Sequence, residues 1–459
     1  MGTLDKIYAC LPLWAQHTAV TAFGAKWWLY RFGPGFQAAA AGFRERQQWD
    51  RAKLEAWQAV RLREFLAAAL RVPHYHDTWN TAQKQAAAAG RLADLPLLDK
   101  APLRAEPRAF LNPAAGIRNP QAFLTSGSTG TPITTYWSPH EYRASMALRE
   151  VRSAGWAGVS FREPRATFSG RLVEPDPESR GPFYRFNLCE HQVYLSPFHL
   201  KPDTAAQYVA ALNRHRVCWL TGYAVSYYLL AKYMLERHLP PPPTLRAVVT
   251  TSEKVTPEMR TVMEQAYGCR VFEEYGTVEN ALFASACEHG RLHVSTDWGI
   301  VEILRPDGTP CAPGEPGEVI ATALMRRVQP LVRYRLGDVA AWDTEPCPCG
   351  RPFPVLKEVL GRVEDVVTGP DGRQMVRFHG IFVAQPHVAE GQIIQETLHD
   401  IRARVVPTAG FGPADVADIQ ARIRQRLGPE VRVAVETVDQ IPRTKAGKFK
   451  AVISHLAPP

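Results

Sequence analysis

Residues 124–132 are rich in groups that can bind phosphate, with five hydroxyl side chains and two glycines among nine positions. Glycine lets the backbone turn so that successive N–H groups converge on an anion, and Ser or Thr hydroxyls add donors or contact a phosphate-bound Mg²⁺. No Gly-Lys-Ser/Thr triplet follows, so the segment is not the Walker A loop of strand-loop-helix NTPases. The pattern predicts a phosphate-binding loop, and a solvated Ser/Thr/Gly linker is the alternative.

Four later segments carry the aromatic, acidic and basic groups that a nucleotide site needs. Residues 275–279 place Tyr275, a glycine turn and Glu279 directly after a predicted strand. Residues 334–338 end on Asp338, and an acid after a strand can accept hydrogen bonds from vicinal ribose hydroxyls. Residues 361–365 contain Arg362, and residues 442–448 end on Lys448 beside a glycine. Each residue alone has a structural alternative: a core tyrosine, a turn acid or a solvated lysine.

The elements that must position these residues are indicated by hydrophobic periodicity. Residues 1–118 are mainly helical, as at 52–69, with short extended breaks expected at 72–75 and 95–100. Between about 123 and 360, short β-branched runs alternate with helical stretches, which predicts an α/β sheet. It includes a strand at 245–250, a helix at 257–267 and a strand at 269–272, followed by an antiparallel meander at 299–304 and 317–322.

The composition changes after residue 365, where a strand at 399–406, a helix at 414–427 and a strand at 431–436 predict a βαβ-like unit. We therefore expect a multi-domain α/β protein. Residues 1–118 form a helical region that covers the large domain, residues 119–363 form its core, and residues 364–459 form a small lid domain.

Taken in order, the five chemistry-bearing segments resemble the adenylate-forming superfamily of acyl-CoA synthetases, adenylation domains and luciferases, over residues 123–449. Within it, the chain is most similar to the branch of phenylacetate-CoA ligases and CapK-like proteins. The marks are Ile133, where a lysine is usual after Pro132, and the segments 196–200, 222–223, 251–253 and 347–351. The segments 72–75 and 95–100 also resemble that branch.

The resemblance implies a large adenylating domain of mixed sheets with packed helices and a mobile α+β C-terminal domain. It implies two half-reactions: a carboxylate attacks the α-phosphate of ATP to give an acyl-adenylate and pyrophosphate, and a thiol then takes the acyl group. One site serves both if the small domain rotates. The hinge acid falls at Glu364, where aspartate is usual, and Asp365 is the alternative.

The resemblance also implies roles for individual residues. Glu279 holds Mg²⁺, Tyr275 stacks on adenine, Asp338 binds the ribose, Arg362 reaches the nucleotide, and Lys448 contacts the α-phosphate during adenylation. The remaining nucleotide-binding residues are Thr125, Ser126, Gly127, Ser128, Thr129, Gly130 and Thr131 around the outer phosphates, and Thr251, Ser252, Glu253, Gly276 and Thr277.

The acyl site is expected beside Phe198 and His199 and the strand that leads to Gly222 and Tyr223. By resemblance, His199 lies beside the carboxylate as a catalytic residue; a core or surface histidine is the alternative. Trp219, Tyr227 and Tyr228 are further aromatic candidates, and adjacent tyrosines on a helix face different ways, so at most one of the two lines the pocket.

Cysteines and a histidine at Cys287, His289, Cys347 and Cys349 form a Cys₃His set if their two segments meet. The one-residue spacing is tighter than that of zinc fingers, and free thiols are the alternative. Similar pairs in CapK-like proteins suggest a structural Zn²⁺. With four protein ligands the site has no open position, so we expect no catalytic role.

The chain has 459 residues, a formal net charge of +9 and 46% hydrophobic residues, as in a globular protein with a sizeable core. The charge is spread along the chain without a groove-reading motif, so we expect no nucleic-acid partner. We expect neither a secretory signal nor a transmembrane segment. Isolated cysteines argue against a disulfide framework and favour the cytoplasm.

We expect the aromatic segment 14–32 to be a helix packed on its own domain, with an interfacial helix on a membrane surface as the alternative. The function expected overall is ligation of an aromatic or apolar acid to CoA, with ATP and Mg²⁺. Transfer to a carrier protein or an amine, and a non-catalytic nucleotide-binding protein on the same fold, are the alternatives. The sequence leaves the acid and the oligomeric state open.

Overall fold

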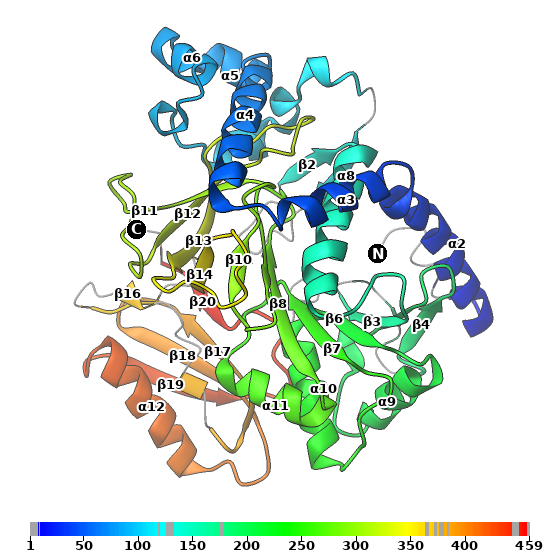
Figure 1. Cartoon of the computed structure of the whole chain (residues 1–459). Coiled ribbons are helices and arrows are strands. Elements are labelled where there is room, and N and C mark those ends of the chain that lie inside the picture. Colours follow the sequence, from blue (N-terminus) through cyan, green and yellow to red (C-terminus); the bar gives the residue numbers. More distant parts are fainter. Residues whose placement is uncertain are drawn as a thin grey trace.

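A computed structural model describes residues 8, 10–117, 120–124, 133–169, 171, 173–174, 176, 179–362, 367–370, 374–375, 381–382, 385–442 and 449–456. Figure 1 shows a large body of sheet and helices, with the N-terminal helices along its upper and right edges and a smaller C-terminal unit at the lower left. The structure is therefore a mixed α/β protein with a large and a small part, as the sequence predicts.

The N-terminal region consists of helices that cover the large domain. They are α2 (Leu13–Phe32), α3 (Phe36–Arg46), α4 (Arg51–Ala69), α5 (Pro73–Thr78), α6 (Thr81–Ala88) and α7 (Lys100–Ala105), with 3₁₀ turns η1 (Leu92–Asp94), η2 (Pro107–Phe110) and η3 (Pro113–Ala115). Local capping explains two of the starts: the Asp50 side chain accepts from the Lys53 N–H, and Asn80 and Gln83 form a capping box.

The extended break predicted at residues 72–75 is wrong beyond its first residue, because Pro73 begins helix α5. Val72, which precedes the proline, is extended, with φ −80° and ψ 128°. Proline at the first helical position loses no hydrogen bond, so Pro73 can begin a helix. The break predicted at residues 95–100 is confirmed up to Asp99, since Leu98 forms a parallel bridge with Tyr334, and is wrong at Lys100, which begins helix α7.

A 12-stranded sheet forms the centre of the large domain, in the order β11-β12-β13-β14-β10-β9-β8-β7-β6-β3-β5-β4. Its strands are β3 (Arg165–Phe168), β4 (Tyr184–Asn187), β5 (Gln192–Leu195), β6 (Trp219–Tyr223), β7 (Ala247–Thr251), β8 (Arg270–Gly276), β9 (Phe283–Ala286), β10 (Leu292–Val294), β11 (Ile300–Leu304), β12 (Gly317–Thr322), β13 (Tyr334–Trp342) and β14 (Val355–Arg362). β5, β3, β6, β7 and β8 run parallel, and the strands on either side pair antiparallel. The predicted meander is confirmed in β11 and β12.

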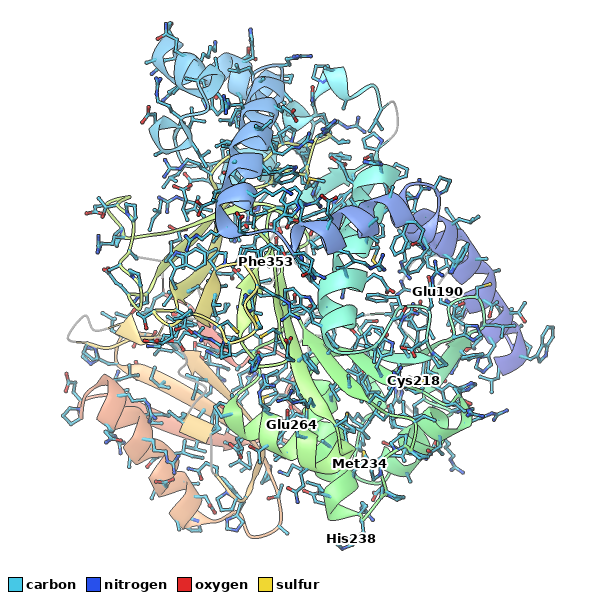
Figure 2. All side chains as sticks on the ribbon, viewed as in Figure 1. Glu190, Cys218, Met234, His238, Glu264 and Phe353 are labelled. Atoms are coloured by element: carbon cyan, nitrogen blue, oxygen red, sulfur yellow. The ribbon has the colours of Figure 1, made fainter. Side chains whose placement is uncertain are left out.

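Helices accompany the parallel strands, as crossover connections require. They are α8 (Pro139–Leu148), which continues into a π-helical turn η4 (Arg149–Ala154), α9 (Ala205–Arg214), α10 (Ala224–Glu236) and α11 (Pro257–Tyr267), with a 3₁₀ turn η5 (Pro197–His199) before α9. Strands β1 (Gln121–Leu124) and β2 (Thr134–Trp137) form a separate antiparallel pair. Side chains fill the space between these layers (Figure 2), and Glu190, labelled near α2, is 3% exposed.

The C-terminal unit is a four-stranded sheet in the order β19-β18-β17-β20 with helix α12 (Pro413–Leu427) packed on it. Its strands are β17 (Val388–Gln395), β18 (Asp400–Pro407), β19 (Arg432–Thr437) and β20 (Val452–Ser454), and a short pair, β15 (Val367–Thr368) and β16 (Gln374–Met375), precedes them. β18 and β19 pair in parallel across α12, which confirms the predicted βαβ-like unit. A buried apolar cluster of its own includes Ile393, Ile419 and Val433.

Candidate functional site

A cavity of about 1320 Å³ lies between the large domain and the C-terminal unit. Its walls come from the ends of β7 and β8, from β13 and β14 and from helix α10, and on the other side from residues 388–391 and 449–452. Ligands of open α/β sheets bind where the carboxyl ends of the parallel strands meet. The cavity occupies that position at β7 and β8, so it is the candidate site.

The chain after β7 is the first predicted segment that reaches this cavity. Thr251, Ser252 and Glu253 all line it. Ser252 has a φ of +70°, a conformation that residues other than glycine seldom adopt and that costs on the order of 1–3 kcal/mol. Such strain concentrates at functional sites, where surrounding contacts hold the backbone in place.

Tyr275 and Asp338 lie together at the cavity although they are far apart in sequence. Tyr275 is half-buried at the last position but one of β8, and its hydroxyl donates to Asp338 Oδ2 at 2.8 Å. Asp338 is 5% exposed and lies on β13. The sheet therefore brings an aromatic ring and a carboxylate to one edge of the cavity, which suits a base and a sugar.

The register of the sheet also brings Arg362 to this edge. Asp338 on β13 is paired directly with Arg362, the last residue of β14. Two residues that the sequence predicts to contact one nucleotide are therefore neighbours by strand pairing.

Glu279 is a buried carboxylate on the cavity wall, 7% exposed. The hydroxyl of Tyr334 donates to Glu279 Oε1 at 3.1 Å. The guanidinium of Arg326, fully buried, donates to the backbone carbonyl of Glu279 and to the Thr135 hydroxyl, and burial lowers the Arg326 pKa to about 10. A carboxylate oxygen held in this way is a suitable ligand for Mg²⁺, which prefers oxygen donors.

Glu253 connects the two parts of the protein. Its Oε2 accepts from the backbone N–H of Val225 at 2.9 Å, and its Oε1 accepts from the backbone N–H of Phe449 at 3.1 Å. Val225 lies in the first turn of α10, where the helix dipole favours a negative charge. One carboxylate thus holds the segment beside Lys448 against the large domain.

Several predicted residues fall outside the part of the chain that the structure describes. These are Thr125, Ser126, Gly127, Ser128, Thr129, Gly130 and Thr131 of the phosphate loop, the hinge candidates Glu364 and Asp365, and Lys448. Their described neighbours nevertheless lie at the cavity: Phe123 and Ile133 flank the phosphate loop, and Phe449 follows Lys448. Gly276 and Thr277 line the cavity as well.

His199 lies away from the cavity and is engaged on both sides of its ring. Nδ1 is 2.8 Å from Ser196 Oγ, Nε2 is 2.9 Å from the Asp176 carbonyl, and the ring stacks on Phe183 at 4.9 Å. Phe198, Gly222 and Tyr223 are also absent from the cavity lining. Gly222 is required where it is, because a Cβ there would lie 1.9 Å from the Phe168 carbonyl. These placements favour structural roles for all four residues.

A different aromatic set, which the sequence did not indicate, lines the cavity. Phe123 stacks on Tyr142 at 5.4 Å, and Trp137 meets Tyr142 edge-on at 5.6 Å. Of the two adjacent tyrosines on α10, Tyr228 lines the cavity and Tyr227 is buried in the core, as expected from helical geometry. The sequence shows no cluster of aromatic residues here, because the three rings come from separate elements, β1, β2 and α8.

Cationic residues that the sequence analysis did not assign also reach the cavity. Lys100 and Arg104 come from α7 in the N-terminal region, and a Cβ on Gly337 would lie 2.8 Å from Lys100 Nζ. Arg149, at the start of the π-helical turn, donates to Glu274 Oε2 at 2.6 Å, and both line the cavity. π-helical turns are frequent at functional sites. The segment 95–100 was noted for its resemblance, without a role for its lysine.

A separate cluster places the ligand atoms of Cys287, His293, Cys347 and Cys349 within 4.8 Å of one another. The predicted set is wrong in one member, because His293 takes the place of His289. His289 is exposed in the β9–β10 turn, and its backbone N–H donates to Cys287 Sγ at 3.4 Å. His293 returns on β10, fully buried beside Cys287. The β9–β10 hairpin reverses the chain and brings His293 back beside Cys287. The prediction chose His289 because it is nearer to Cys287 in sequence.

The geometry of this cluster fits a tetrahedral metal ion. Around Zn²⁺, ligands at about 2.3 Å for sulfur and 2.0 Å for nitrogen lie about 3.8 Å apart for S–S and 3.5 Å for S–N. The Sγ atoms of Cys287 and Cys347 are 3.6 Å apart, and Cys349 Sγ is 3.3 Å from His293 Nε2. His293 Nδ1 lies 3.0 Å from the Phe353 carbonyl, which fixes the tautomer that directs the Nε2 lone pair to the cluster.

Comparisons of sequence identify relatives of the chain. Residues 371–455 match the CapK C-terminal domain family. The chain is 24% identical over 342 residues to protein CapK of Staphylococcus aureus, which covers 72% of this chain and 74% of CapK. It is 25% identical over 240 residues to phenylacetate-coenzyme A ligase of Thermus thermophilus, over 46% of this chain and 54% of that ligase.

Comparisons of structure identify the fold. The crystal structure of 2-hydroxyisobutyryl-CoA ligase in the postadenylation state with R3-HIB-AMP has a TM-score of 0.67 at 19% identity, over 90% of this chain and 91% of that one. The same ligase in the thioesterification state, with 2-HIB-AMP and CoA, has a TM-score of 0.54 at 20% identity over 90% and 91%.

Proposed function

We propose that this chain is an ATP-dependent, AMP-forming acid–thiol ligase of the adenylate-forming superfamily, in the branch of CapK and phenylacetate-CoA ligase. One observation supports this above the others. Tyr275, Glu279 and Asp338 line one cavity whose opposite wall carries Phe449, the residue after Lys448.

In the first half-reaction, a carboxylate oxygen of the acid bonds to the α-phosphorus of ATP, and the bond from that phosphorus to the bridging oxygen breaks. Pyrophosphate leaves and acyl-AMP remains. Tyr275 contacts adenine, Asp338 accepts hydrogen bonds from the ribose, and the segment 125–131 holds the outer phosphates. Lys448 stabilises negative charge on the α-phosphate and the attacking carboxylate. Glu279 holds Mg²⁺, which when bound neutralises phosphate charge.

In the second half-reaction, the sulfur of a thiol attacks the carbonyl carbon of acyl-AMP. The bond from that carbon to the phosphate oxygen breaks, AMP leaves, and the thiol proton is lost. CoA is the proposed thiol. The C-terminal domain turns between the two steps about the Glu364–Asp365 segment, so that Lys448 withdraws after adenylation. Glu253 holds the adenylating arrangement through its bond to the Phe449 N–H.

The aromatic walls of the cavity support an aromatic or otherwise apolar acid as the substrate. Phe123, Trp137 and Tyr142 supply ring faces, and Tyr228 lies on the side of α10. Buried aromatic rings contribute large apolar contact areas, which disfavour a highly charged acyl group. The ion pair of Arg149 and Glu274 supplies polar groups at the same wall.

We also propose that Cys287, His293, Cys347 and Cys349 bind a structural Zn²⁺. Four protein ligands leave no open position for chemistry, so the ion stabilises the loops after β9 and β13 rather than acting on substrate. Unpaired thiols at all eight cysteines support a reducing compartment, and we place the reaction in the cytoplasm.

The test is pyrophosphate release over a panel of carboxylic acids, measured with CoA, with hydroxylamine and with neither acceptor. We expect release that depends on one class of apolar acid, and thioester formation when CoA is present. Acid-dependent release without thioester would favour a carrier protein or an amine as the acceptor. Nucleotide binding without release for any acid would favour the non-catalytic alternative.

Lys448→Ala tests the assignment of the lysine. We expect adenylation to fall by at least about a hundredfold while ATP binding is largely kept, because the lysine acts on charge that develops in the transition state. Lys445→Ala is the matched control three residues earlier in the sequence, and should retain most activity. Unchanged pyrophosphate release from Lys448→Ala would refute the assignment.

A further inference from the structure

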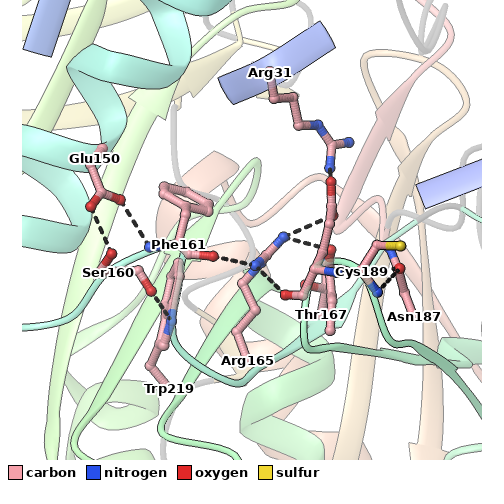
Figure 3. Close-up of polar contacts among 11 residues, drawn as sticks. Arg31, Glu150, Ser160, Phe161, Arg165, Thr167, Asn187, Cys189 and Trp219 are labelled. Atoms are coloured by element: carbon pink, nitrogen blue, oxygen red, sulfur yellow. Dashed lines mark hydrogen bonds and ion pairs between the residues drawn. The ribbon is translucent and has the colours of Figure 1, made fainter. Parts of the chain in front are cut away.

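Helix α2 is fixed to the large domain along one face. Figure 3 shows Arg31 of α2 pointing toward the group of polar contacts around Arg165. The Arg31 Nη1 atom lies 2.7 Å from Glu190 Oε1. Glu190 in turn binds the buried Arg165 at 2.9 Å. Near the other end of α2, Gln16 Oε1 accepts from Arg185 Nε at 2.6 Å. The helix is therefore a built part of the domain.

The opposite face of α2 is apolar and exposed. Trp14 is 73% exposed, Leu29 60% and Trp28 43%. Trp14 and Trp28 are 14 positions apart, close to four helical turns, so they lie on the same side about 21 Å apart along the axis. With Leu13 and Phe23, which lie on other sides of α2, and Leu188, whose backbone N–H donates to Thr21 Oγ1, six of the eleven exposed large hydrophobic residues in the described chain lie on or against this helix. Such a concentration marks an interaction surface.

Among the described residues, α2 and the side chains that contact it carry exposed positive charge. Helix α2 contains no Asp or Glu, Lys26 on it is exposed, and the Arg171 guanidinium lies 5.7 Å from the Phe23 ring. The carboxylate of Glu190, which contacts α2, is buried and bound to two arginines. The surface therefore complements an anionic partner that also has an apolar layer.

We propose that the outer face of α2 docks on the surface of a bilayer that contains anionic lipids. Tryptophan prefers the boundary between headgroups and acyl chains, and a helix with tryptophan at both ends of one face can lie flat in that boundary. Exposed lysine and arginine add attraction to anionic headgroups. No described helix is long and apolar enough to cross a membrane, so the contact is peripheral.

The inner side of α2 packs against the aromatic wall of the cavity. Trp27, on the inner side of α2, lies 6.1 Å from the Phe123 ring and 5.8 Å from the Tyr142 ring, and both of those rings line the cavity. One helix thus separates the proposed bilayer contact from the aromatic wall. An apolar acid held in the membrane would have a short path to the site, a consequence that rests on the proposed function although the docking itself does not.

Vesicle flotation of the full chain tests the docking, with neither ATP nor acid present. The probes are vesicles of phosphatidylcholine alone and vesicles that also contain phosphatidylglycerol. We expect the protein to float with the anionic vesicles, and less so at high salt, because screening weakens headgroup attraction. Lys26→Glu should reduce flotation with anionic vesicles. If the same amount of protein remains unbound with both vesicle types, the proposal is overturned.

The triple variant Trp14→Ser, Trp28→Ser, Leu29→Ser should lower partitioning at least about tenfold, since it removes three large apolar side chains from the contact. The control is Val60→Ser with Leu398→Ser, which removes exposed hydrophobic residues from α4 and the C-terminal unit and should float as the wild type does. Both variants should retain pyrophosphate release with a dissolved acid. If the triple variant floats normally, or changes self-association instead, the face does not bind lipid.

Discussion

Glu253 is the residue through which the two parts of the site depend on each other. Its two carboxylate oxygens accept from backbone N–H groups in different domains. Glu253→Gln keeps the volume but presents an NH₂ group to one of those donors. We expect adenylation to slow by about tenfold or more, since an N–H left without its acceptor costs about 1–3 kcal/mol. ATP binding to the large domain should change less.

The measurement for Glu253→Gln is single-turnover formation of acyl-AMP. Glu236→Gln is the matched control, because Glu236 also lines the cavity, is exposed, and lies at the far end of the same helix α10. An equal slowing in both variants would show that charge in the cavity matters, rather than the bond to Phe449.

Arg326 is a residue whose loss should be felt in stability. Its guanidinium satisfies the Glu279 carbonyl, the Tyr136 carbonyl and the Thr135 hydroxyl. Arg326→Met leaves these buried acceptors without a donor, and we expect the free energy of unfolding to fall by roughly 3 kcal/mol. Denaturant titration measures this. Arg335→Met, which removes partly exposed pairs with Asp99 and Glu318, should cost about 1 kcal/mol or less.

Among individual residues, the sequence predicts those that belong to a short sequence motif. Tyr275, Glu279 and Asp338 were predicted from motifs of five residues, and all three line the cavity. Arg326 was not predicted, because its partner Tyr136 is 190 residues away and a lone arginine has no pattern. The bond from Glu253 to Phe449 spans 196 residues and is equally invisible in the sequence.

Among the elements, the hairpin of β9 and β10 decides which histidine joins the three cysteines. We expect the purified protein to contain about one zinc per chain, as four protein ligands require. His293→Ala should lose most of the metal and lower the unfolding temperature. His289→Ala should retain the metal, because that side chain lies exposed in the turn. Elemental analysis of both variants measures the outcome.

A metal-free wild-type protein that is purified without chelators would count against the zinc proposal. Equal metal content in His293→Ala and the wild type would count against the assignment of the ligand. The distinction between the two histidines depends on strand register, which pairs His293 with Ser285 and leaves His289 between the strands.

Elements with strong periodicity were predicted well. Helix α11 has the predicted bounds, and α12 begins one residue earlier than expected. The order of the strands was beyond the sequence, because β14 lies between β13 and β10 although β10 precedes both in the chain. Such long-range pairing depends on how the whole sheet closes its hydrogen bonds, and periodicity carries no information about it.

For the molecule as a whole, the proposed two-step reaction depends on the position of the C-terminal unit relative to the large domain. In the present structure, the Glu253 carboxylate of the large domain accepts from the Phe449 N–H of the C-terminal unit. The proposed second step needs another arrangement. Rotation about a few backbone bonds near residue 364 would provide it without unfolding either part.

Glu364→Pro tests this rotation. Proline fixes φ, so we expect acyl-AMP to form within about threefold of the wild-type rate while thioester formation falls by at least about a hundredfold. Glu364→Ala is the control, because alanine leaves φ free, and it should support both steps. Rapid-quench measurement of the two products separates them. Normal thioester formation by Glu364→Pro would place the pivot elsewhere.

The pairing of Asp338 with Arg362 has a mechanical consequence. Arg362 is the last residue of its strand. The axis of the proposed swing would therefore pass beside the ribose site proposed at Asp338, and not through a distant linker. Points near an axis travel little while distant points travel far. A nucleotide seated there could stay in place as the far end of the small domain sweeps through a wide arc, so the enzyme would exchange one catalytic face for another without releasing its intermediate.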